Sequence, residues 1–187
     1  PIDGPQVGYS GETATIRKLA EINVQETPRI PSGLAELDRV LGGGFVPGSV
    51  VLMGGDPGAG KSTLLLQVST ALAQQRSVLY VTGEESLQQL ALRAKRLRLP
   101  LDGLQVAAET RVEVIANQIE TSRPDVVIVD SIQVMQMGSL DATPGSVTQV
   151  RETAAFLTRL AKQRDVVIVL VGHITKEGAI AGPKVLE

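Results

Sequence analysis

The sequence predicts an α/β protein with a mainly parallel sheet and helices on both faces of that sheet. Short apolar runs alternate along the chain with segments in which apolar residues recur at helical spacing. A glycine-rich G-x-x-x-x-G-K-[ST] sequence lies between one apolar run and one helical segment. Strands and helices in this order are typical of parallel sheets, which bind ligands outside the carboxyl ends of their strands.

The positions of glycine and proline and the spacing of apolar residues predict the first elements. Residues 1–31, interrupted by glycine and proline, predict a strap or linker, and residues 32–187 predict the folded core. A short helix from Ser32 ends at the three glycines of 42–44. An apolar strand at 50–53, the glycine-rich loop at 55–62 and a helix through Leu72 come next.

The remaining elements alternate in the same way. Ser86 with Gln89, and Thr110 with Glu113, each form a capping-box pattern that predicts the start of a helix. The other predicted elements are strands at 78–81, 104–107, 126–129 and 166–171 and a helix over 147–161.

The glycine-rich loop predicts a site for ATP or GTP. Backbone N–H groups can surround a polyphosphate only where no Cβ blocks their approach. Lys61 adds a cation for the β- and γ-phosphates, and Ser62 offers a hydroxyl to Mg²⁺. The alternative, a glycine-rich turn before a helix that begins Lys-Ser, is disfavoured by the strand before it and the helix after it. The predicted nucleotide-binding residues are Gly55, Asp56, Pro57, Gly58, Ala59, Gly60, Lys61, Ser62 and Thr63.

Three further residues, Glu84, Asp130 and His173, each follow the carboxyl end of a predicted strand, at the edge where the loop must lie. Asp130 is the predicted Mg²⁺ ligand, directly or through water, together with Ser62. Its alternative role is that of an ordinary turn or cap residue.

Glu84 and Glu85 are the candidates for polarising the water that attacks the γ-phosphate, and Glu84 is favoured. Alternatively, both carboxylates stabilise the positive end of the following helix. His173 either senses the γ-phosphate through a hydrogen bond or satisfies a backbone group, and these two roles stay open.

Composition limits the class of protein. The 187 residues, 43% of them apolar, suffice for one domain, and the absence of cysteine excludes disulfides and thiolate metal sites. No long apolar run or signal peptide is found, so a soluble, cytoplasmic protein without membrane contact is expected. A net charge of −2 and few aromatic residues argue against a free-standing nucleic-acid binder. Because the chain lacks an initiator Met, we expect a fragment of a longer protein.

Several stretches, spread over nearly the whole chain, together resemble the bacterial RadA (Sms) family of RecA-like ATPases. They are residues 37–44, 55–62, 81–86, 129–133 and 182–187. The resemblance implies a RecA-like P-loop fold and a homo-hexameric ring that uses ATP and Mg²⁺ to move on DNA. It also implies branch migration during recombination and repair, with single-stranded DNA, recombination intermediates and the RecA recombinase as partners.

By position, Lys61 and Ser62 resemble the family's first nucleotide motif and Asp130 its second. Glu84 resembles the catalytic glutamate, and His173 resembles the γ-phosphate sensor, so Lys61, Glu84 and His173 are the expected catalytic residues.

The family's two DNA-binding loops fall at residues 135–148 and 175–182, the second flanked by Lys176 and Lys184 as candidate DNA contacts. Ordinary surface loops have the same residue content. Arg93 and Arg96, on the helix after Glu84, are candidates for a contact with the adenine base, although a solvated helical face is the favoured interpretation.

The sequence departs from the family pattern at both ends. A four-cysteine zinc module is missing, so zinc is expected only in that module, and the core is expected to be incomplete before its last strands. Two other functions remain open: a nucleotide-gated DNA-binding scaffold with incidental hydrolysis, and a RecA-like ATPase that acts on protein.

Overall fold

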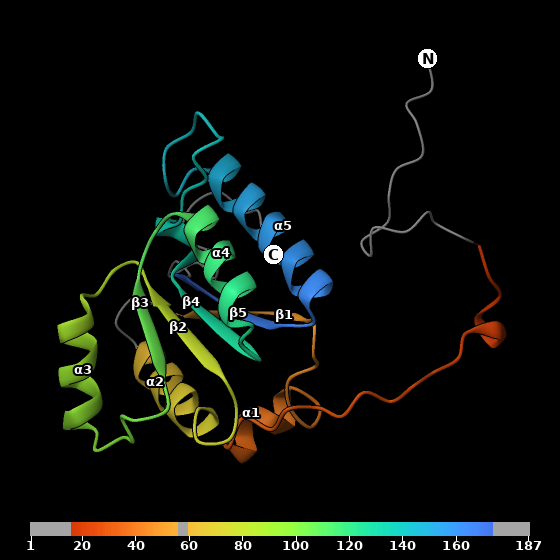
Figure 1. Ribbon diagram of the computed structural model, residues 1–187, viewed down its shortest axis with the longest axis horizontal. Coiled ribbons are helices and arrows are strands. Elements are labelled where there is room, and N and C mark those ends of the chain that lie inside the picture. The colour runs from red at the N-terminus through yellow and green to blue at the C-terminus, as the bar shows by residue number, and fades with distance from the viewer. Residues whose placement is uncertain (1–15, 56–59, 174–187) are drawn as a thin grey trace.

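A parallel five-stranded sheet forms the centre of the protein in the computed structural model, which describes residues 16–55 and 60–173 (Figure 1). The strand order is β1-β5-β4-β2-β3, and every neighbouring pair is parallel. The strands are β1 (Val50–Gly55), β2 (Val78–Thr82), β3 (Gln105–Ala108), β4 (Val126–Asp130) and β5 (Val167–His173). The predicted α/β fold with a parallel sheet is therefore confirmed.

The central strands explain why apolar runs predict them well. β2 and β4 are buried at every position, and β5 at all but its last, because helices cover both faces. β1 and β3 are the outer strands among the described residues, and both are partly exposed. Neither strand contains a fully buried residue, as expected for strands with one described strand neighbour.

Helices form a layer on each face of the sheet (Figure 1). α4 and α5 pack on one face, and α2 and α3 pack on the other with apolar side chains of the α1 segment. The bounds are α1 (Ala35–Val40), α2 (Lys61–Leu72), α3 (Leu87–Arg96), α4 (Val112–Ser122) and α5 (Val147–Arg164), with short 3-10 turns η1 (Leu19–Glu21) and η2 (Ile132–Val134). Within the described residues, no helix is long and apolar enough to cross a membrane.

The described part of the N-terminal segment lies outside this core. Residues 16–29 are exposed and lead away from the sheet in Figure 1. From residue 16 onwards, Ile30 is the first buried residue, and it forms an antiparallel bridge with Phe45. The boundary between a strap over 1–31 and a core over 32–187 stays a prediction.

The two predicted capping boxes have different outcomes. At α3, the Ser86 hydroxyl accepts from the Gln89 amide, and the Gln89 side chain accepts from the Ser86 amide. The box predicted from Thr110 and Glu113 is wrong, because α4 begins one residue later, at Val112. Its first amide donates to the Gln136 carbonyl, so a tertiary contact replaces the local cap.

Glu109 stabilises the turn before α4. Its carboxylate accepts from the backbone amides of Thr110 and Arg111 and from the Arg111 guanidinium, at 2.9–3.0 Å. These bonds, above all those from the Arg111 side chain, lower the pKa of Glu109 to about 2. The folded protein therefore binds a proton at Glu109 less readily than the unfolded chain does.

Glu109→Gln is accordingly expected to lower the free energy of unfolding by an amount that depends on pH. Because the native pKa is depressed, the stabilisation is complete above the ordinary pKa of 4.5 and disappears as pH falls towards about 2. We expect the variant to lose at most about 1 kcal/mol at neutral pH, since solvent screens the pair. Urea unfolding of both proteins between pH 7 and pH 3 measures this difference. If the difference in unfolding free energy between the two proteins did not narrow below pH 4.5, the stabilising role of the Glu109 carboxylate would be contradicted.

Candidate active site

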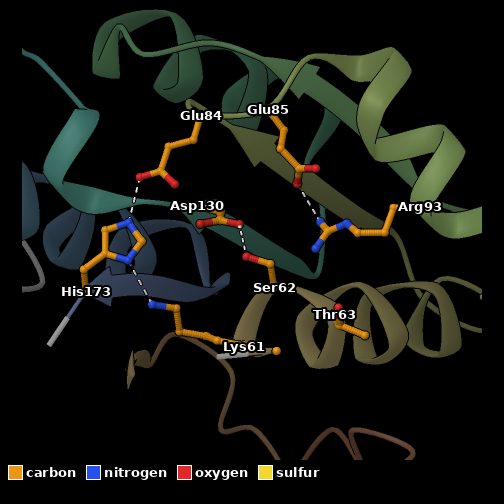
Figure 2. A pocket seen from close by; sticks show the side chains of 9 residues that line it. Lys61, Ser62, Thr63, Glu84, Glu85, Arg93, Asp130 and His173 are labelled. Atoms are coloured by element: carbon orange, nitrogen blue, oxygen red, sulfur yellow. Dashed lines mark hydrogen bonds and ion pairs between the residues drawn. The ribbon is translucent and has the colours of Figure 1, made fainter. Parts of the chain in front are cut away.

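A cavity of about 350 Å³ opens at the carboxyl ends of β4, β5 and β2, beside the start of α2 (Figure 2). The side chains around it come from segments far apart in the sequence. The lining residues are Gly60, Lys61, Ser62, Thr63, Glu84, Glu85, Arg93, Asp130 and His173. Because parallel strands end at the same edge of a sheet, the topology alone brings the predicted residues together.

Lys61, the first residue of α2, follows Gly60, which has the left-handed φ of 76° that glycine tolerates. The Lys61 ammonium donates to the carbonyls of Gly55 and Gly172, at 3.1 and 3.0 Å. It also lies 3.1 Å from His173 Nδ1. An ammonium group has only donors, so Nδ1 must be the acceptor in this contact.

The second ring nitrogen of His173, Nε2, therefore carries the hydrogen and donates a hydrogen bond to Glu84 Oε1, 2.8 Å away. Figure 2 shows the imidazole between Lys61 and Glu84. Of the two roles predicted for His173, this position favours a contact within the site over the satisfaction of a backbone group. Sensing of the γ-phosphate stays a prediction.

Glu84 is held by a second donor, the Ser131 hydroxyl, at 2.7 Å from the same oxygen. Partial burial alone would raise the pKa of Glu84. Hydrogen bonds from His173 and Ser131, with the positive charge of Lys61, outweigh that effect and lower the pKa. Glu84 is thus a carboxylate at neutral pH, with its other oxygen, Oε2, left for a water molecule.

Asp130 lies at the centre of the site, at the end of β4 (Figure 2). Its Oδ2 accepts from Ser62 Oγ at 3.2 Å and from the Tyr80 hydroxyl at 2.8 Å. Burial, followed by the charge and hydrogen bond of Asp130, raises the pKa of Tyr80, so this phenol stays protonated. The other carboxylate oxygen, Oδ1, is buried and has no protein partner.

This donor set fits Mg²⁺. A buried carboxylate oxygen without a partner is costly, and a cation or its bound water would satisfy it. Mg²⁺ is usually held by one or two protein oxygens together with phosphate oxygens and water. Among residues 16–55 and 60–173, no group of three His, Cys, Asp or Glu side chains is placed to hold a metal ion. Ser62 and Asp130 are the residues that would hold the ion.

Glu85 occupies a different position from Glu84. Its carboxylate accepts from the Arg93 guanidinium at 2.6 Å, in a partly buried ion pair at the cavity wall. Its charge is thereby engaged, and this supports Glu84 as the group that faces water. The favoured interpretation of Arg93 as part of a solvated helical face is wrong, because α3 turns this residue into the cavity, whereas Arg96 is exposed.

Not every predicted residue can be placed. Gly55, Gly60, Lys61, Ser62 and Thr63 are described, whereas Asp56, Pro57, Gly58 and Ala59 lie outside the described residues. Lys176, Lys184 and the predicted loop at 175–182 also lie outside them. Neither Tyr80 nor Ser131 is among the predicted site residues, although Ser131 directly follows Asp130 and Tyr80 is the one aromatic residue of β2.

The predicted first DNA loop, residues 135–148, is anchored to the core. The buried side chain of Gln149 accepts from the Met137 amide at 3.1 Å and donates to the Ala142 carbonyl at 2.8 Å. The Gly138 amide donates to Glu113 at 2.8 Å. The segment therefore has a defined path in spite of its glycine and serine content.

The fold and the site together define a P-loop nucleoside-triphosphatase domain, and residues 18–179 match the family described as AAA domain. The chain belongs to the RadA family. The DNA repair protein RadA of Haemophilus influenzae is 62% identical over 181 residues, which are 96% of this chain and 40% of that protein. RadA of Escherichia coli is 59% identical over 96% of this chain, and RadA of Streptococcus pneumoniae is 48% identical over 100% of it. The chain spans only 40–44% of the length of these three relatives.

Proposed function

We propose that this domain binds ATP with Mg²⁺ and hydrolyses it to drive a DNA motor in recombinational repair. The observation that carries the proposal is the single cavity shared by Lys61, Ser62, Glu84 and Asp130. The relatives named DNA repair protein RadA supply the biological setting. A cytoplasmic location is consistent with that setting.

Each side chain has a separate role in the proposed hydrolysis. Lys61 neutralises charge on the β- and γ-phosphates, while Ser62 and Asp130 hold the cation. When bound, Mg²⁺ stabilises charge that develops on the phosphate oxygens. Glu84 accepts a hydrogen bond from the attacking water through the oxygen that neither Ser131 nor His173 occupies. His173 connects that carboxylate to Lys61 and so is well placed to respond to the γ-phosphate.

The proposed DNA substrate is single-stranded DNA or a branched recombination intermediate, handled by a homo-hexameric ring that promotes branch migration. The segment 135–148 contains no lysine or arginine. Its contacts with DNA would therefore use backbone amides and hydroxyl groups, which bind phosphate without reading sequence. Lys176 and Lys184 supply the positive charge in this proposal, and the RecA recombinase is the proposed protein partner.

Lys61→Ala in the full-length protein tests the nucleotide part of the proposal. The substitution removes charged hydrogen bonds to phosphate, each worth about 1.5–3 kcal/mol, so we expect ATP affinity to fall by about 10–100-fold. Calorimetric titration with ATP and Mg²⁺ measures the affinity. The exposed Lys18→Ala provides a control that removes one lysine charge far from the cavity. Equal affinities of Lys61→Ala and wild type would refute the proposed site.

The DNA part requires turnover measurements on the full-length protein, with and without single-stranded DNA. A motor hydrolyses ATP faster with DNA and moves branch points only while hydrolysis continues. A nucleotide-gated scaffold would instead bind DNA and ATP, with the same branch movement when hydrolysis is blocked. Turnover that ignores DNA, or responds to a protein partner instead, would favour the RecA-like ATPase that acts on protein.

A further inference from the structure

Tyr80 is a fully buried residue of β2 with its hydroxyl beneath the proposed cation site. The backbone places it there, because β2 and β4 are adjacent parallel strands in which Tyr80 pairs with Ile128 and Thr82 pairs with Asp130. From this position the phenol donates a 2.8 Å hydrogen bond to Asp130 Oδ2. A buried tyrosine thus reaches the residue proposed to hold Mg²⁺, without lining the cavity itself.

The bond selects one of the two carboxylate oxygens. Tyr80 and Ser62 both donate to Oδ2, at 2.8 and 3.2 Å. Oδ1 is buried and receives no hydrogen bond from the protein. The carboxylate is therefore held with one oxygen occupied and the other available for a cation or for a water molecule bound to it.

The packing of Tyr80 does not require its hydroxyl. The ring belongs to the apolar cluster formed with α2 and α3, where phenylalanine would fill nearly the same volume. A buried hydroxyl is costly unless it is hydrogen-bonded, and the Tyr80 hydroxyl meets this requirement at Asp130. The hydroxyl consequently contributes to the orientation of Asp130 rather than to the volume of the core.

We propose that Tyr80 is a positioning residue for the divalent cation, because its hydroxyl holds Asp130 in the orientation that leaves Oδ1 facing the ion. This inference rests on the proposed binding of ATP with Mg²⁺. Groups that orient metal ligands typically change metal affinity by about 10–100-fold when they are removed. Without the phenol, Asp130 Oδ2 would keep only the longer hydrogen bond from Ser62, at 3.2 Å. The carboxylate would then be held less firmly in the orientation that leaves Oδ1 for the cation, at a cost in cation affinity.

The test compares Tyr80→Phe with wild type in the full-length protein. Mg²⁺ is titrated at a fixed concentration of a non-hydrolysable ATP analogue, and nucleotide binding is followed by calorimetry. We expect half-maximal binding to require at least about tenfold more Mg²⁺ in Tyr80→Phe. Nucleotide affinity measured in EDTA is expected to be the same in both proteins, since the phenol acts only through Asp130.

Thr70→Val is the matched control, because it also removes a buried hydroxyl from the α2 side of the sheet. Thr70 Oγ1 donates within its own helix, to the Leu66 and Gln67 carbonyls. The Thr70→Val variant is expected to have a changed thermal stability but the same Mg²⁺ requirement as wild type. Thermal melting of each variant first sets a temperature at which all proteins are folded, and binding is measured there.

The outcomes separate this inference from the proposed function. If wild type binds the analogue with no dependence on Mg²⁺, the proposed function fails. If wild type depends on Mg²⁺ and Tyr80→Phe has the same requirement, only the role of Tyr80 is overturned. The same conclusion holds if Tyr80→Phe and Thr70→Val shift the requirement equally, because a general loss of stability would then explain both.

Discussion

Glu84→Gln is expected to lower ATP turnover of the full-length protein by about 10²–10⁴-fold, the usual contribution of a general base. The amide has nearly the same shape as the carboxylate but cannot accept a proton from water. The hydrogen bonds from Ser131 and His173 can persist to the amide oxygen, so the variant should retain its fold. Nucleotide affinity is expected to change little, since the Lys61 and Ser62 contacts with phosphate and cation remain. Steady-state turnover and calorimetric binding together measure the two effects.

Glu85→Gln is the matched comparison for Glu84→Gln, since the two glutamates are adjacent and line the same cavity. The Glu85 carboxylate is engaged by Arg93, so its loss should weaken that pair and reduce turnover much less. The lowered pKa of Glu84 adds a second criterion, because the base should stay ionised throughout the neutral range. The assignment of Glu84 as the base would be wrong if Glu84→Gln kept wild-type turnover. It would also be wrong if Glu85→Gln lost more turnover than Glu84→Gln.

The elements that the sequence predicts well are those in which local pattern and tertiary packing agree. The run Val126–Asp130 is apolar until its last residue, and the structure buries all of it between two helical layers. Ser86 and Gln89 form their cap within four residues of one another, so no distant contact is needed. Glu84, Asp130 and His173 meet because strand order follows from the alternating pattern, not from any side-chain signal.

The contacts that the sequence does not predict are formed between distant parts of the chain. Thr110 and Glu113 match the capping pattern, but Gln136 takes over the first amide of α4 and Glu113 bonds to Gly138. Arg93 lies on a polar helix that could equally face solvent, and only its pairing with Glu85 places it in the cavity. Local pattern cannot reveal such pairings, because each depends on the register between elements.

Gly83→Ala is expected to impair both stability and turnover, although the change adds only one methyl group. Gly83 lies between β2 and Glu84, and its amide donates to the Asp130 carbonyl at 2.8 Å. A Cβ at this position would lie 2.5 Å from Val134 Cγ2 and 3.0 Å from Met135 Cε, both closer than carbon atoms pack. Overpacking of this kind costs about 1–3 kcal/mol of folding free energy.

Met135 Cε can shift because it is the end of a flexible side chain, but the β-branched side chain of Val134 is stiff, so relief of the closer clash is expected to move one side of the active site. If η2 moves, it carries Ser131, which donates to Glu84. If residue 83 moves instead, it carries Glu84 itself. A misplacement of about 1 Å at a reacting group can cost about 10²-fold in rate, so a loss of this order is expected in the folded variant. Urea unfolding measures the first effect, and turnover well below the melting temperature measures the second.

Gly138→Ala provides the control, because a Cβ there has one neighbour at 3.9 Å, an ordinary van der Waals contact. It makes the same chemical change in the segment that follows η2 and keeps the amide that donates to Glu113. Its stability and its turnover without DNA are expected to match wild type. If Gly83→Ala behaved in the same way as Gly138→Ala, the packing of η2 against residue 83 would not determine the position of Glu84. The catalytic geometry would then have to be maintained by His173 and Ser131 alone.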